Sequence, residues 1–169
     1  LSGHDKTFLK KLSDDLPILA DICRADIALC CPTKKRQAIV VAQAVPHSVT
    51  PLYNQNRVGT SVTSITQSEM LHGFGAGAKS SAVHTIDVRG ATIARQMLPV
   101  WSETGKPIAV MTHDSYWLAY ERQRRRNKVF QQALAQFCRM TLQGGLNGAK
   151  GLTPFGAHDG IMYVDAKRR

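Results

Sequence analysis

Hydrophobic residues recur at steps of three and four over residues 5–24, from Phe8 to Ile22. This spacing gathers them on one face of a helix, so the segment predicts an amphipathic helix. Pro17 falls inside it, shortly after a serine and two aspartates that could cap a second helix. We therefore expect the helix to be kinked or restarted at this proline.

Two pairs of apolar runs, rich in β-branched residues, predict two strand hairpins. Residues 26–32 and 37–46 are separated by the polar sequence TKKR, which is typical of two strands joined by a turn. Residues 91–113 hold two further runs around the sequence ETGK, in which Gly105 can adopt the positive φ of a tight turn. Both hairpins predict antiparallel pairing.

The segments around the second hairpin predict a loop and two helices. Residues 47–66 are rich in Pro, Asn, Gly, Ser and Thr and predict a long loop, for which a ligand lid is one use. Residues 67–77 predict a short helix. A long helix is predicted from about residue 116 to 143, ended by two glycines, with an apolar stripe at Phe130, Leu134, Phe137 and Thr141.

The order of these elements predicts an α+β fold, in which an antiparallel sheet carries its helices packed on one side. The chain has 169 residues, 43% of them hydrophobic, which suffices for one domain with its own core. We assign residues 1–145 to this domain. Residues 146–169 are assigned to a linker and the first strand of a following domain.

The charge and the length of the apolar runs limit the classes of function. Lys and Arg number 22 against 12 Asp and Glu, and the net charge of +10 favours an anionic ligand, nucleic acid, acidic lipid or an acidic partner. No apolar run approaches the roughly 20 residues that span a bilayer. The chain begins without an initiator methionine or a signal-peptide pattern, so we interpret it as a cytoplasmic piece of a longer protein.

Sequence motifs of catalysis are absent. The chain has no phosphate-binding GxxxxGK[ST], no HExxH, no GxSxG, and none of the nucleotide-binding motifs or the phospho-accepting histidine box of histidine kinases. Its four cysteines have no CxxC spacing and its six histidines lie in no ligand spacing. We expect a non-catalytic fragment without cofactor or metal, with a redox or haem sensor as an alternative.

Five short motifs occur in a fixed order along the chain. They are the opening LSGHD with LADICRADIALCCP, which contains Ala25, Asp26 and Pro32; VGT at Val58, Gly59 and Thr60, followed by Val62; LPV at Leu98–Val100; IAV at Ile108–Val110; and DGIMYVDA with Asp159, Gly160 and Asp165. In this order they resemble the GAF-like N-terminal sensor domain of soluble bacterial two-component sensor histidine kinases, a group well represented in actinobacteria. In that group a PAS domain and the kinase core follow the sensor domain, and the resemblance covers nearly the whole chain.

The resemblance implies a GAF/PAS-like fold and a role in signal input. Such a domain binds a small ligand, forms a dimer, or does both, and thereby regulates the kinase. The implied partners are a second copy of the chain, the protein's own PAS and kinase domains, and a response regulator. ATP would be the cofactor of the full-length kinase, and the strand at residues 160–169 would open the PAS domain.

Four residues are candidates for ligand binding. His113 lies at the end of the return strand of the second hairpin, where GAF-like sheets face their pocket. Arg95 and Met97 on the opposite strand could share that face with the loop residue Tyr53. The planar guanidinium of Arg95 would suit an anionic ligand.

A basic run precedes the apolar stripe of the last predicted helix. Five of the seven residues at 122–128, among them Arg122 and Arg125, are basic. We interpret the run as a solvated helix start, and a basic nucleic-acid-binding module is the alternative, although the aromatic residues precede the charges and do not alternate with them. Because cations oppose the dipole of a helix N-terminus, they could meet acidic residues of a neighbouring domain. The interaction helix would consist of these arginines with Phe130, Leu134 and Phe137.

Overall fold

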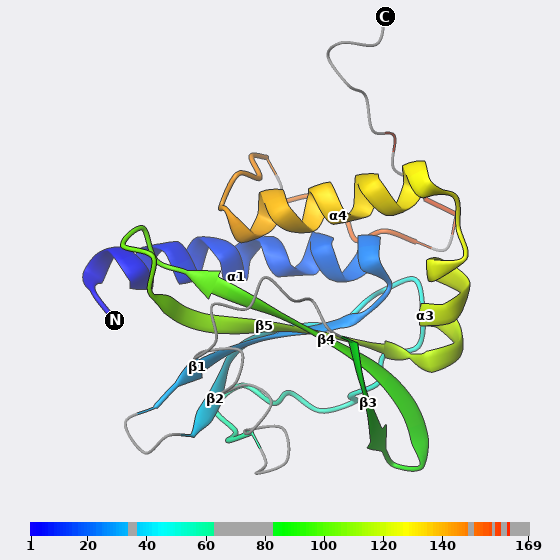
Figure 1. Cartoon of the computed structure of the whole chain (residues 1–169), viewed down its shortest axis with the longest axis horizontal. Coiled ribbons are helices and arrows are strands. Elements are labelled where there is room, and N and C mark those ends of the chain that lie inside the picture. The colour runs from blue at the N-terminus through cyan, green and yellow to red at the C-terminus, as the bar shows by residue number, and fades with distance from the viewer. Residues whose placement is uncertain (34–36, 63–82, 149–150, 157, 160–161, 163–169) are drawn as a thin grey trace, which may run out of the picture.

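The computed structural model describes residues 1–33, 37–62, 83–148, 151–156, 158–159 and 162. Within them, an antiparallel sheet has the strand order β2-β1-β5-β4-β3, and α1 and α4 run along the same side of it (Figure 1). The elements are α1 (Gly3–Cys23), β1 (Asp26–Pro32), β2 (Ala38–Ala44), β3 (Val83–Val88), β4 (Ala91–Trp101), β5 (Pro107–Tyr116), α3 (Trp117–Arg124) and α4 (Lys128–Leu142). The predicted α+β class, with helices packed on one side of an antiparallel sheet, is confirmed.

Helix α1 starts at a capping box and continues through its proline. The hydroxyl of Ser2 accepts a hydrogen bond from the Asp5 amide, and the Asp5 carboxylate accepts one from the Ser2 amide, which satisfies two free donors of the first turn. The restart expected at Pro17 does not occur. Leu16 and Leu19, on either side of the proline, are buried against the sheet, and this packing holds both halves in one helix.

Both predicted hairpins are present, and a further strand lies at the edge of the sheet. Gly105 closes the turn between β4 and β5 with φ = 73°, as expected. Strand β3 was not predicted, because its sequence VHTIDV mixes polar and apolar residues and no side chain in it is fully buried. The short helix predicted at residues 67–77 lies outside the described residues.

The single helix predicted from about residue 116 to 143 is wrong, because the structure has two helices there. Helix α3 ends at Arg124, and α4 begins at Lys128 with Asn127 as its N-cap. The Asn127 side chain accepts a hydrogen bond from the Phe130 amide at 2.8 Å, a contact that favours a helix start over helix continuation. The predicted stop is confirmed by Gly144, whose φ is 65°.

The main core lies between the sheet and the two long helices. Leucines of α1 pack on Ile27 and Leu29 of β1 and on Met111 of β5, and Leu134 and Phe137 of α4 pack against this cluster. A smaller cluster on the opposite face contains Ala28, Cys30, Ala38, Val40, Met97 and Val110. No described helix is both long and apolar enough to cross a membrane.

The C-terminal segment has no helix or strand among its described residues 146–148, 151–156, 158–159 and 162. The amide of Phe155 donates a hydrogen bond to the Asp21 carboxylate at 3.0 Å, so part of the segment returns to α1. The strand predicted to open the next domain lies largely outside the described residues. The division at residue 145 stays a prediction.

Candidate functional site

The four predicted ligand residues lie on different faces of the sheet. His113 pairs with Ile27 on one side and Gln96 on the other, and Ile27 belongs to the helix-covered core. Because side chains alternate along a strand, His113 faces the helices, whereas Arg95 and Met97 face away from them. Tyr53 contacts Arg95 on that second face. The expected common face therefore holds three of the four residues, and their role in ligand binding stays a prediction.

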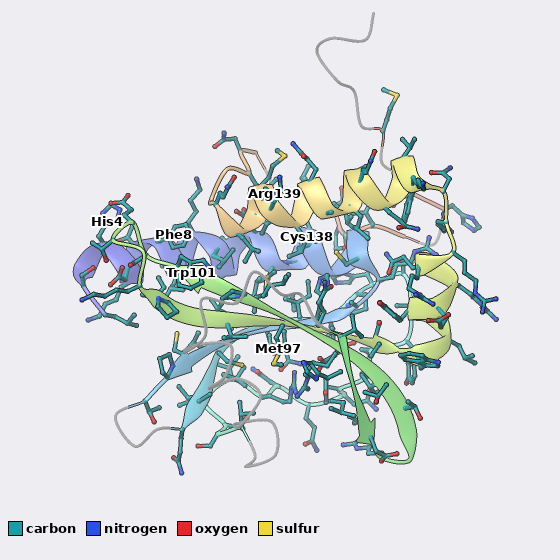
Figure 2. All side chains as sticks on the ribbon, viewed as in Figure 1. His4, Phe8, Met97, Trp101, Cys138 and Arg139 are labelled. Carbon is teal, nitrogen blue, oxygen red and sulfur yellow. The ribbon has the colours of Figure 1, made fainter. Side chains whose placement is uncertain are left out.

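A groove of about 920 Å³ lies on the helix-covered side of the sheet. Gln96 and Leu98 of β4 line it from the sheet, while Phe130 and Leu134 line it from α4. Helix α3 closes one end. Residues near the start of α1, together with Trp101 at the end of β4, close the other (Figure 2). The groove exists because α1 packs on β1 and β2, so that the side chains of α1 do not cover the part of this face formed by β4.

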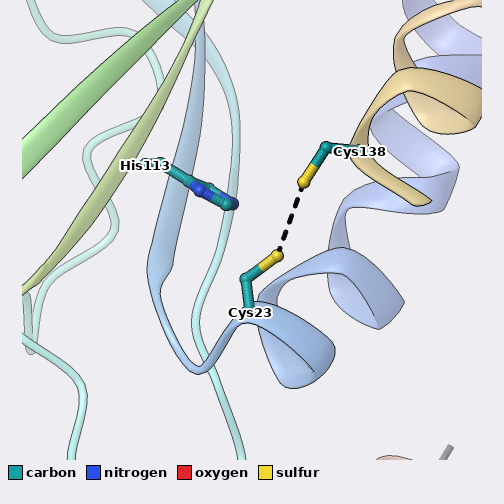
Figure 3. Close-up of side chains that lie close together, drawn as sticks. All are labelled: Cys23, His113 and Cys138. Carbon is teal, nitrogen blue, oxygen red and sulfur yellow. Dashed lines mark hydrogen bonds between the residues drawn. The ribbon is translucent and has the colours of Figure 1, made fainter. Parts of the chain in front are cut away.

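Three potential ligand side chains converge in the wall of this groove. Cys23 comes from the end of α1, His113 from β5 and Cys138 from the middle of α4 (Figure 3). The two sulfur atoms lie 3.9 Å apart, and one ligand atom of each residue lies within 4.8 Å of the others. The Nε2 atom of His113 is inaccessible to solvent and has no hydrogen-bond partner among the described residues.

Burial sets the protonation of these groups. It lowers the pKa of His113 to about 4, so the imidazole is neutral at pH 7. Burial raises the pKa of Cys23 well above its ordinary value. The hydrogen bond from Cys23 lowers the pKa of Cys138, because it stabilises the Cys138 thiolate.

Sequence spacing gave no sign of this cluster. Its members lie at positions 23, 113 and 138, on three elements that only the tertiary fold brings together. A search for short ligand spacings therefore finds no site. The one usable signal was the alternation along β5, which places His113 on the same face as the buried Met111.

The opposite face holds a buried ion pair. The Arg95 guanidinium donates from Nε and Nη2 to the two carboxylate oxygens of Asp114, at 2.8 and 2.6 Å. Arg95 is 4% exposed and Asp114 is 0% exposed. The Tyr53 hydroxyl donates to Asp114 at 2.8 Å and accepts from Arg95 at 3.2 Å. An anionic ligand at Arg95 would have to compete with Asp114, which already occupies the guanidinium in bidentate geometry.

Asp26 fixes the long loop to this face. Its carboxylate accepts hydrogen bonds from the amides of Leu52 and Tyr53, at 2.9 and 3.4 Å. Arg57 stacks on the Tyr53 ring with its guanidinium carbon 3.5 Å from the ring centroid. Burial raises the pKa of Asp26, although the hydrogen bonds from the two amides act in the opposite direction. The described part of the predicted loop is thus a cover tied to the sheet by buried polar contacts.

We expect Asp26→Ala to release this cover. Two amides lose their acceptor, which costs about 1–3 kcal/mol, and residues 47–62 should become a preferred site of limited proteolysis. The matched control is Asp87→Ala, because Asp87 also accepts from a backbone amide, that of Gly90, but is exposed near the end of β3. Equal cleavage rates in wild type and Asp26→Ala would contradict this role.

The basic run spans the end of α3 and the start of α4. Arg122 lies in the last turn of α3 and Arg125 is its C-cap residue; both are exposed. Arg124 and Arg125 pair with Glu121 at 3.1 and 3.6 Å. The expectation that these cations oppose a helix N-terminus is wrong for Arg122, Arg124 and Arg125, because they lie at the C-terminus of α3, where the helix dipole favours positive charge.

The apolar residues of the predicted interaction helix link the groove to the core. Phe130 and Leu134 line the groove, and Leu134 and Phe137 pack against the buried cluster of α1 and the sheet. On the outward side of α4, Val129 is 67% exposed and Met140 is 37% exposed. One helix therefore contacts the groove, the core and the solvent.

Comparisons with known proteins agree with this architecture. The sequence profile of the family described as "Histidine kinase PdtaS, GAF domain" matches residues 1–134. A solved structure of the sensor region of a sensor histidine kinase superposes with a TM-score of 0.65 at 21% identity, covering 89% of this chain and 52% of that one. The chain thus spans about half the length of that structure. A search of curated proteins found no match.

More distant similarities concern the fold alone. An IclR transcriptional regulator from Alicyclobacillus acidocaldarius has a TM-score of 0.53 at 11% identity, covering 82% of this chain and 66% of its own. The transcriptional regulator YaiJ has a TM-score of 0.52 at 8% identity, covering 82% of this chain and 95% of its own. These likenesses do not favour the nucleic-acid-binding alternative, whereas the family match supports the sensor interpretation. The chain belongs to the family of GAF domains of the histidine kinase PdtaS, and it is a signal-input domain.

Proposed function

We propose that the domain receives its signal as a small molecule in the groove and passes it to the kinase through α4. The observation that carries the proposal is that α4 contacts both the groove and the hydrophobic core. Leu134 faces the groove and also packs with Phe137 on the core. An occupant of the groove therefore touches the same helix whose packing defines the end of the domain.

The signal acts by shifting a balance between two arrangements of α4. A ligand changes such a balance only by the difference in its affinity for the two states. Because α4 forms one wall of the groove, a change in its distance from β4 changes the contacts that a ligand makes. Ligand affinity and helix position are then thermodynamically linked.

The setting of the domain in the whole protein is part of the proposal. By its family, the full-length protein would be an ATP-dependent cytoplasmic histidine kinase with its own PAS and kinase domains and a response regulator as partner. This fragment would be non-catalytic. Association as a homodimer is supported by the exposed apolar residues Val129 and Met140 on the outward side of α4.

A bulky side chain placed in the groove should imitate the ligand. Gln96 points into the groove from β4 and is half-buried, so we expect Gln96→Trp to change the autophosphorylation rate of the full-length kinase. Allosteric couplings are typically 1–3 kcal/mol, so a change of about 5-fold or more is expected, in either direction.

Thr92→Trp is the matched control. Thr92 lies two residues before the groove-lining Ala94, on the same strand and face, but it is exposed and outside the groove. The control should phosphorylate at the wild-type rate. Equal rates in all three proteins, with unchanged thermal unfolding, would refute the groove as the input site.

A further inference from the structure

We propose that Cys23, His113 and Cys138 form a zinc-binding site with one coordination position open to the groove. All three residues line the groove proposed to receive the signal. A role of the zinc in signalling rests on that proposed function, whereas zinc binding itself does not. Within the described residues, no other three His, Cys, Asp or Glu side chains come as close together.

The separation of the sulfur atoms fits tetrahedral zinc. With Zn–S bonds of about 2.3 Å, two thiolates of a tetrahedral site lie about 3.8 Å apart. The Sγ atoms of Cys23 and Cys138 are 3.9 Å apart. The His113 ligand nitrogen lies within 4.8 Å of both sulfurs, so a shift of about 1 Å in the imidazole completes three ligands at zinc distances.

The buried nitrogen of His113 is a second, independent indication of a ligand. Nε2 has no accessible surface and no partner among the described residues. Buried polar atoms are almost always paired, so such an atom needs an explanation, and a bound ion is one. A metal bonded to Nε2 would satisfy it.

A disulfide between the two cysteines explains less. It requires the sulfur atoms to approach from 3.9 Å to about 2.05 Å, and it leaves Nε2 of His113 without a partner. Zinc uses all three side chains at nearly their present positions. The metal would also bridge α1, β5 and α4, so its presence would fix α4 against the sheet.

Three protein ligands leave zinc with one free position, as in zinc sites that accept water or an external ligand. In this domain the free position faces a groove lined by Leu98, Phe130 and Leu134. The ligand class that fits is a small molecule with an apolar body and one donor atom for zinc, such as a thiolate, an imidazole nitrogen or a carboxylate.

The test is zinc binding by the reduced 169-residue chain, measured by competition with a chromophoric chelator. We expect one tight zinc ion per chain. Cobalt(II) at the same site should give the intense visible absorption of tetrahedral coordination and a thiolate-to-cobalt charge-transfer band. Cys138→Ser should lower zinc affinity by at least about 100-fold, since loss of a direct ligand costs more than loss of a supporting contact. With cobalt(II), the variant should show a weaker thiolate-to-cobalt charge-transfer band, because only one thiolate remains.

Cys138→Ser is the primary variant because Cys138 is only half-buried and a serine there leaves the fold intact, which circular dichroism checks. His113→Gln is the second variant and should also weaken zinc binding. The control is Cys30→Ala with Cys31→Ala, which removes two buried thiols on β1 outside the cluster. It should bind zinc as wild type does.

Zinc binding that is equal in wild type and Cys138→Ser would overturn the proposal. Failure of the reduced wild-type chain to bind zinc would also overturn it. That holds equally if the same chain, after mild oxidation, forms a disulfide between Cys23 and Cys138 in high yield. These outcomes are independent of the kinase assay on Gln96→Trp. If the chain binds zinc but Gln96→Trp has no effect on the kinase, the groove is refuted as the input site and the metal site stands. If Gln96→Trp changes the kinase rate but the chain binds no zinc, the metal site alone is refuted.

Discussion

Asp114→Ala is expected to lower the free energy of unfolding by about 3–5 kcal/mol. The substitution leaves the Arg95 guanidinium buried at 4% exposure without the carboxylate that receives its two hydrogen bonds. It also removes the acceptor of the Tyr53 hydroxyl. The cost is that of an uncompensated buried charge, which exceeds the net contribution of the pair itself.

Two variants separate these contributions in urea unfolding experiments. The double variant Arg95→Met, Asp114→Leu removes both charges and should recover most of the loss. Glu121→Ala breaks two ion pairs whose arginines are 64% and 80% exposed, and it should change stability by less than about 1 kcal/mol. A loss below about 1 kcal/mol for Asp114→Ala would show that water reaches Arg95.

Phe137→Asp is expected to cost about 3 kcal/mol or more. The variant removes an aromatic ring that packs on the main core and places a carboxylate in its position. For a chain of this size, that loss corresponds to a fall of roughly 6–12 °C in the midpoint of thermal unfolding. Any dimer that depends on α4 should dissociate with it.

Gln136→Asp is the control for Phe137→Asp. It introduces the same charge at the adjacent position of α4, where the side chain is exposed. Calorimetry and analytical ultracentrifugation of both variants give the stability and the state of association. An unchanged melting midpoint together with an unchanged monomer–dimer balance in Phe137→Asp would refute the structural role of this residue.

The main elements of the fold could be predicted because local patterns determine them. The three- and four-residue steps around Leu12 and Leu16 correspond to the buried face of α1, and the turn at Gly105 follows from its backbone freedom. Strand β3 could not be predicted, since an edge strand buries little and carries no clear alternation. The break before α4 depends on one side chain, Asn127, whose capping contact competes with the helical preference of its neighbours.

The candidate site was only partly accessible to sequence analysis. The alternation of strand residues places Arg95 and Met97 on one face, but the partner of Arg95, Asp114, is 19 residues away. His113 was expected to share the face of Arg95 and Met97, but its pairing with Ile27 of β1 and Gln96 of β4 places it on the opposite face, which lines the groove. The cluster with Cys23 and Cys138 required the tertiary contact between α1 and α4.

Hydrogen exchange of the α4 amides, residues 128–142, tests the central claim most directly. It would be measured by mass spectrometry on wild type, Gln96→Trp and Thr92→Trp. The substituted side chain of Gln96→Trp lies on β4, so a change in α4 must pass through the groove. We predict altered exchange over α4 in Gln96→Trp and wild-type exchange in Thr92→Trp. Identical exchange of α4 in all three proteins would contradict the coupling of the groove to the helix.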